Sequence, residues 1–123
     1  MNTDITLNKN SDFKRTYKKG QDYVSGLMVS YILNRNKKDN RYGVTASKKI
    51  GNAVKRNRSR RVILAAYRKI SPYIKPGYDI VFVARAATAG SKSSDILKVM
   101  QKHLLQAGAI KESCVKNVLK LSI

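Results

Sequence analysis

The chain has 123 residues, enough for one domain with a modest core and too few for two. Its 26 lysines and arginines stand against seven aspartates and glutamates, and the net charge of +19 exceeds what solubility requires. A solvated charged surface, a ribosomal type of protein and a protein that binds anionic membranes are the rival interpretations. The charge lies within patterned segments rather than in a tail, which favours nucleic acid as the partner.

Cysteine content and hydropathy indicate the compartment. Cys114 is the only cysteine, so no disulfide can form within the chain and a reducing compartment is the default. We expect Cys114 to be a small buried or half-buried apolar residue. The first residues lack the basic and apolar regions of a secretory signal, and no run approaches the ~20 apolar residues that span a bilayer. We therefore expect a cytoplasmic protein without a membrane partner.

The first expected element is a short helix. We expect residues 1–10 to form a mobile polar lead-in, followed by a helix that Ser11 can cap and Gly20 ends. Phe13 and Tyr17 lie four residues apart and share one face of this helix, among lysines and arginines. These rings either anchor the helix in the core or stack on unpaired bases, and the pattern alone leaves both interpretations open.

Strand-forming residues recur in three longer segments. Residues 26–33 alternate between two faces, with Leu27, Val29, Tyr31 and Leu33 on one and Met28, Ser30 and Ile32 on the other. Residues 42–46 follow a polar connector and are expected to pair back on 26–33 as a hairpin. A short piece around residues 23–24 can add an edge. Residues 78–85 are nearly continuously apolar, which is typical of a central strand covered by helix.

A basic helix is expected between Asn52, which can cap it, and Pro72. On a helical projection its apolar side, able to face a core, consists of Val62, Ile63, Ala66 and Ile70. Its opposite side consists of Arg56, Asn57, Arg60, Arg61 and Arg68. No acid stands between residues 48 and 61, so the cations repel one another and an external polyanion is the expected partner. The planar guanidinium of arginine suits phosphate oxygens.

The last full helix should begin at Ser93 or Ser94 and end at Gly108. Its expected buried stripe consists of Ile96, Met100, Leu104 and Ala107. His103 lies at the margin of that stripe and is interpreted as a packing residue rather than a ligand or a base. Residues 109–123 form a tail of uncertain structure that can hold one short turn.

These elements follow the order helix, strands, basic helix, strand, helix. The order predicts a single α+β domain over residues 1–123, a small sandwich in which helices pack on a mixed sheet of about four strands. No internal repeat or low-complexity segment interrupts it.

The residues themselves argue against a catalyst. The seven acids are widely scattered, and there is a single histidine, so neither a carboxylate pair for metal ions nor a two-histidine acid and base arrangement is evident. No phosphate-cradling glycine motif and no zinc-ligand set occur.

One segment carries a more specific signal. Residues 47–61, SKKIGNAVKRNRSRR, resemble the RNR signature of the protein subunit of bacterial ribonuclease P, with the turn and the Arg-Asn-Arg at the family's spacing. The resemblance covers about residues 7–108. It implies that the basic helix forms a left-handed crossover between two parallel strands, against the usual hand. Leu64 stands where the family usually has a basic residue, so the contact that other members make there is either absent or replaced by an apolar contact to a sugar or base. A third interpretation is that Leu64 is simply an exposed leucine.

The resemblance implies a function. The protein would bind the catalytic RNA subunit and the single-stranded 5′ leader of precursor tRNA, and so assist the endonucleolytic removal of the leader. Catalysis and the Mg²⁺ ions it needs would belong to the RNA, so the protein would contain no catalytic residue, bind no cofactor or metal strongly, and need no obligate protein partner. The alternative is a general RNA-binding or ribosomal type of protein with no catalytic partner.

Two sets of site residues follow from the resemblance. The set expected to contact the RNA subunit and its phosphates is Lys48, Lys49, Lys55, Arg56, Asn57, Arg58, Arg60, Arg61 and Arg68. The set expected to form a cleft for the leader is Lys9, Phe13, Tyr17, Tyr31, Thr45 and Ser47.

Overall fold

The computed structural model describes residues 5–7 and 9–111. The elements in chain order are β1 (Ile5–Thr6), α1 (Asn10–Lys19), β2 (Gln21–Val24), β3 (Met28–Asn34), β4 (Arg41–Thr45), the 3₁₀ turn η1 (Lys48–Ile50), α2 (Ala53–Ile70), the 3₁₀ turn η2 (Ser71–Tyr73), β5 (Tyr78–Ala84) and α3 (Ser93–Gln106). Cys114 and most of the tail predicted over residues 109–123 lie outside the described residues.

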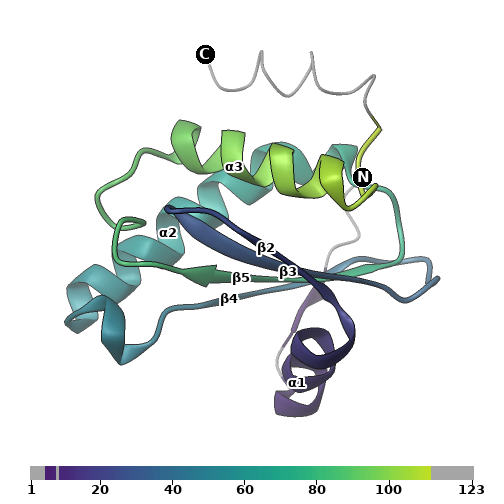
Figure 1. The fold of residues 1–123 in the computed structure, drawn as a ribbon, viewed down its shortest axis with the longest axis horizontal. Coiled ribbons are helices and arrows are strands. Elements are labelled where there is room, and N and C mark those ends of the chain that lie inside the picture. Colours follow the sequence, from purple (N-terminus) through teal and green to yellow (C-terminus); the bar gives the residue numbers. More distant parts are fainter. Residues whose placement is uncertain (1–4, 8, 112–123) are drawn as a thin grey trace.

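The strands form one mixed sheet in the order β1-β4-β5-β3-β2. The pairs β2–β3 and β3–β5 are antiparallel, whereas β4–β5 and β1–β4 are parallel. Helices α2 and α3 lie on one face of the sheet and α1 lies on the other (Figure 1). The α+β class and the mixed sheet expected from the sequence are confirmed, and the element order is as expected from α1 onward; the two-residue strand β1 adds a fifth strand to the four that were expected.

The pairing of the strands corrects one prediction. Residues 42–46 were expected to pair with residues 26–33, but β5 lies between these two strands: Val81 is opposite Tyr31 on one side and opposite Gly43 on the other. Because β5 is buried along almost its whole length, it is best placed in the middle of the sheet. The hairpin that does form is β2–β3, in which Val24 pairs with Val29. Helix α2 connects the parallel strands β4 and β5; the left hand of this crossover stays a prediction.

The beginning of the chain also differs from expectation. The segment interpreted as a lead-in contains β1, which pairs with β4, and Leu7 is buried, with its backbone N–H donating to the carbonyl of Tyr42 at 2.7 Å. Burial of Leu7 against the sheet removes apolar surface from water, and this favours the pairing of the beginning of the chain with β4.

The helix ends follow the sequence signals in part. Asn52 caps α2, and its Oδ1 accepts a hydrogen bond from the backbone N–H of Lys55 at 3.0 Å. Helix α1 begins at Asn10 after Lys9, so Ser11 lies inside it and does not cap it. Helix α3 begins at Ser93, and the carboxylate of Asp95 accepts from the N–H of Lys92 at 3.3 Å in place of a serine cap.

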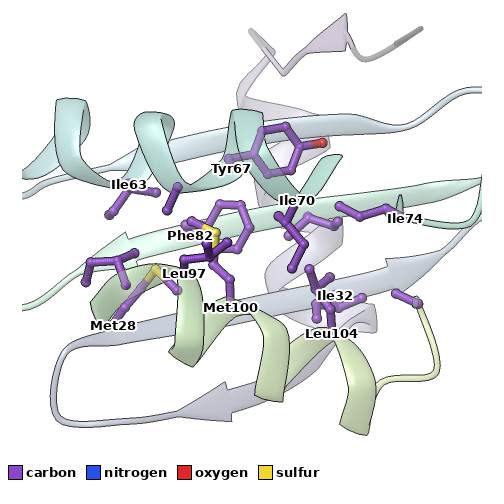
Figure 2. Packing of buried hydrophobic residues seen from close by; sticks show 14 of the residues in the cluster. Met28, Ile32, Ile63, Tyr67, Ile70, Ile74, Phe82, Leu97, Met100 and Leu104 are labelled. Carbon is purple, nitrogen blue, oxygen red and sulfur yellow. The ribbon is translucent and has the colours of Figure 1, made fainter. Parts of the chain in front are cut away.

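The core lies between the sheet and the pair α2 and α3 (Figure 2). Its largest fully buried side chains include Met28, Ile63, Ile70, Ile80, Phe82, Ile96, Leu97, Met100 and Leu104. The apolar stripes predicted for both helices are confirmed, with Val62 and Ala107 only half-buried. Tyr67 was not predicted to be in the core, yet its ring is buried 4.6 Å from that of Tyr42 and 5.6 Å from that of Phe82.

His103 is buried in the same layer. Its Nδ1 lies 2.8 Å from the hydroxyl of Ser30, and its ring is 6.0 Å from that of Tyr23. Burial lowers the pKa of His103, and the nearby charge of Lys102 lowers it further. The geometry is that of the packing residue expected from the sequence.

Candidate nucleic-acid interface

The face of the sheet that carries α1 contains an open groove. The groove has a volume of about 350 Å³ and is lined by Asn10, Phe13, Lys14, Tyr17 and Thr45. Tyr17 is 38% exposed, and its ring meets that of Tyr31 edge-on at 4.8 Å and lies 6.5 Å from that of Phe13. Exposed aromatic faces beside a lysine are the features by which proteins stack unpaired bases and hold the adjoining phosphates.

The predicted cleft residues are only partly gathered here. Phe13, Tyr17 and Thr45 line the groove, and Tyr31 supports Tyr17 from β3. Lys9 and Ser47 are exposed but do not line it; they precede α1 and η1, respectively. Their contact with the leader stays a prediction.

Two lining residues were missing from the predicted cleft. Asn10 and Lys14 share the groove face of α1 with Phe13 and Tyr17, because residues at positions i, i+3, i+4 and i+7 lie above one another on a helix. That spacing is visible in the sequence and could have identified both residues.

An ion-pair cluster holds α1 against the sheet. The side chain of Asp79, on β5, is fully buried and lies 2.7 Å from Nη2 of Arg41 and 3.3 Å from Nη2 of Arg15. Asp12, on α1, also pairs with Arg41, at 3.3 Å. The hydrogen bonds to Asp79 are the largest cause of a raised pKa at Arg41. Arg35 joins the cluster through Asp79 and Asp39.

The acids are scattered in the sequence, but three of them lie close together in the fold. The fold brings Asp12, Asp39 and Asp79 together, but three arginines balance their charge. Within residues 5–7 and 9–111, no three histidine, cysteine or acidic side chains are grouped so that they could hold a metal ion. The carboxylates therefore fix α1 in position.

The second surface is the basic face of α2 and η1. The exposed members of the predicted set are Lys48, Lys49, Lys55, Asn57, Arg58, Arg61 and Arg68, and the half-buried members are Arg56 and Arg60. Among the described residues, no carboxylate lies within ion-pair distance of a lysine or arginine of α2. The positive charge of this face is therefore available to an external anion.

Backbone carbonyls orient several of these arginines. Arg56 donates to the carbonyl of Gly51 at 3.2 Å, and Nε of Arg58 donates to the carbonyl of Ala89 at 2.6 Å. Arg60 donates to the side chain of Asn57 at 3.3 Å. These contacts restrain the guanidinium groups without neutralising them, so they are partly ordered before any anion binds.

The basic face is not uniformly polar. Leu64 is half-buried, which excludes the interpretation that it is simply an exposed leucine. A shallower groove of about 260 Å³ is lined by Arg58, Arg61, Val62 and Ala65. Phosphates and the apolar faces of sugars or bases could both be accommodated there.

A short segment connects the two surfaces. Thr45 lines the groove at the end of β4, Ala46 follows it, and η1 then leads into α2. A second nitrogen of Arg60 reaches the carbonyl of Ala46 at 3.5 Å. The basic face therefore extends to the end of the aromatic groove.

Comparison with known proteins identifies the family. The model of the family described as Ribonuclease P matches residues 1–108, most of the chain. The chain belongs to the ribonuclease P protein family. The ribonuclease P protein component of Clostridioides difficile is 49% identical over 94 residues, 75% of this chain and 82% of that protein. That of Oceanobacillus iheyensis is 35% identical over 123 residues, covering 98% of this chain and all of the other.

A solved structure agrees with this assignment. The RNase P protein of Staphylococcus aureus superimposes with a TM-score of 0.74 at 31% identity, covering 86% of this chain and 97% of that one. This chain is accordingly a protein subunit of ribonuclease P, an RNA-binding protein of tRNA processing. In the part that the structure describes, no helix is both long enough and apolar enough to cross a membrane.

Proposed function

We propose that this subunit binds the catalytic RNA of ribonuclease P through the basic face of α2 and the single-stranded 5′ leader of precursor tRNA through the groove beside α1. The observation that carries this proposal is the continuity of the two surfaces: Arg60 extends from the basic face to Ala46, the residue after Thr45 of the groove. The catalytic RNA on α2 and the leader of a precursor tRNA bound beside it would thus be held by adjoining parts of the protein.

The groove is suited to a single strand rather than a duplex. Bases within a duplex are stacked on each other, so an exposed ring such as Tyr17 can stack only on a base that has been released. The leader supplies unpaired bases, whereas mature tRNA lacks that segment. Lys14 at the groove wall is placed to attract the phosphates of the same strand.

Catalysis is assigned to the RNA subunit in this proposal. The acids that the fold brings together are occupied by arginines, which leaves the protein with positioning and charge neutralisation as its physical tasks. Mg²⁺ would be held by the RNA, and the protein would need no cofactor and no obligate protein partner. The site of action is the cytoplasm, where precursor tRNA is made and the single cysteine stays reduced.

Reconstitution tests the proposal. A 5′-extended precursor tRNA is incubated at low Mg²⁺ with the cognate RNA subunit, with this protein, and with both. We expect cleavage at the mature 5′ end only with both, or much faster than with RNA alone. If the protein does not change the rate, it binds RNA in general without supporting this reaction. Cleavage by the protein alone would contradict the assignment of catalysis to RNA.

A further inference from the structure

Gly43 lies in the middle of β4, on the face of the sheet that α1 covers. A Cβ atom added at Gly43 would lie 2.6 Å from both Cε1 and Cζ of Phe13, and 3.5 Å from Cβ of Leu7. Ordinary van der Waals contacts begin at 3.4 Å, so an alanine here would force the Phe13 ring to withdraw by about an ångström. The ring of Phe13 is therefore seated directly on the backbone of β4.

The backbone does not explain the glycine. Gly43 pairs regularly with Val81, and it is not among the glycines with positive φ. Glycine in the interior of a strand weakens the strand, and it is expected where another group approaches the backbone closely. The group that approaches is the ring of Phe13.

The neighbours of Gly43 on the same face contact α1 or the groove as well. Arg41 pairs with Asp12 at 3.3 Å, and Thr45 lines the groove. Residues 41, 43 and 45 point to one side because side chains alternate along a strand. Strand β4 therefore forms an ion pair with α1, provides the backbone surface on which the Phe13 ring packs, and forms part of the groove wall.

We propose that Gly43 is a positioning residue for leader binding, which acts by seating Phe13 and thereby setting the depth of the groove. This inference rests on the proposed binding of the leader in that groove. Phe13 lies one helical turn before Tyr17, with 6.5 Å between the ring centroids. A Phe13 ring lifted from the sheet would enter the space that a base needs or displace Tyr17 from Tyr31.

The test is the preference of the reconstituted complex for precursor over mature tRNA. It is measured as the Kd of mature tRNA divided by the Kd of precursor tRNA, so a weaker preference gives a lower ratio. Gly43→Ala should lower this ratio about five- to tenfold, part of the effect of losing one base stack, and leave the Kd of mature tRNA unchanged. Phe13→Leu should lower it as well. The double variant should lose less than the two losses combined, because leucine leaves room for the added Cβ. Gly26→Ala is the matched control, because no atom lies within 4 Å of its added Cβ, and it should keep the parent ratio.

Several results would overturn the role of Gly43. These are a Gly43→Ala complex with the parent ratio, an equal loss of affinity for both tRNAs, and independent losses in the double variant. If Gly43→Ala does not fold, the double variant must fold and keep part of the preference, and its failure to do so also counts against the inference. A parent complex that does not prefer precursor tRNA would instead contradict the proposed function itself.

Discussion

At the scale of single residues, Tyr17 carries the proposed contact with the leader. Among the aromatic rings in the described part of the chain, only Tyr17 is exposed rather than buried or half-buried, and Tyr31 supports its edge. The sequence left it open whether Phe13 and Tyr17 anchor the helix or stack on bases, and in the structure the two rings differ in their burial. Phe13 packs on the strand at Gly43 through Cε1 and Cζ of its ring, whereas the ring of Tyr17 is exposed to solvent. Burial distinguishes the two, and a spacing of four residues cannot.

Tyr17→Ala should weaken binding of precursor tRNA by ~1–3 kcal/mol through the loss of a base stack and leave mature tRNA unaffected. Tyr17→Phe is the matched variant, since it keeps the ring and should remain close to the parent. Both are measured as Kd values of the reconstituted complex. Equal weakening toward the two tRNAs would mean that the ring only supports the fold.

His103 makes stability depend on pH. Its folded pKa lies below the ordinary value of 6.5, so the unfolded chain binds the proton more tightly and acid favours unfolding. Above pH 6.5 His103 is neutral in both the folded and the unfolded chain and costs no stability. As the pH falls from 6.5 toward the folded pKa, the free energy of unfolding should decrease. Urea titrations of the parent and His103→Gln across this range provide the comparison. Parallel pH profiles would contradict this assignment.

At the scale of elements, the buried cluster around Asp79 attaches α1 to the sheet. Asp79→Asn should lower the free energy of unfolding by about 3–5 kcal/mol, because it leaves the arginines around a buried position without their shared counter-charge. Asp39→Asn is the control; its side chain is 37% exposed and its loss should cost less than about 1 kcal/mol. Urea unfolding measures both, and similar costs for the two variants would argue against the cluster as the main attachment.

The basic face of α2 should determine how RNA binding depends on salt. Removing one phosphate contact lowers the slope of log K against log salt by about one unit, so Arg60→Ala should flatten the plot by that amount. Lys98→Ala, an exposed change on α3, serves as the control for charge alone. An unchanged slope for Arg60→Ala would remove this arginine from the contacting set.

The elements show what sequence patterns can and cannot predict. The 3.6-residue period identified the buried stripes of α2 and α3, and alternation identified the faces of β3, because these depend on local geometry. The apolar run of residues 78–85 correctly predicted a central strand, but the order of strands depends on distant partners, so its insertion between β3 and β4 was not predicted. Tyr67 was missed as a core residue for a similar reason, since its partners Tyr42 and Phe82 come from separate strands.

At the scale of the molecule, the two faces of the sheet have different tasks. Helices α2 and α3 cover one face and α1 lies on the other (Figure 1). The first face carries the apolar core, and the second carries the ion-pair cluster and the aromatic groove. The charge of +19 was sufficient to predict a nucleic-acid partner, and the RNR run its family. The cluster around Asp79 was not predictable, because its arginines and carboxylates come from α1, β4, β5 and a connector far apart in sequence.

The central claim is that the leader lies in the groove beside α1, and photochemical crosslinking tests it most directly. A precursor tRNA with 4-thiouridine in its 5′ leader is bound to the reconstituted complex and irradiated, and the attached peptide is identified by mass spectrometry. We expect the leader to be attached to peptides that contain Phe13, Tyr17 or Tyr31, which are within reach of the groove. Attachment only to peptides of α2 or α3 would place the leader elsewhere on the protein and contradict this account.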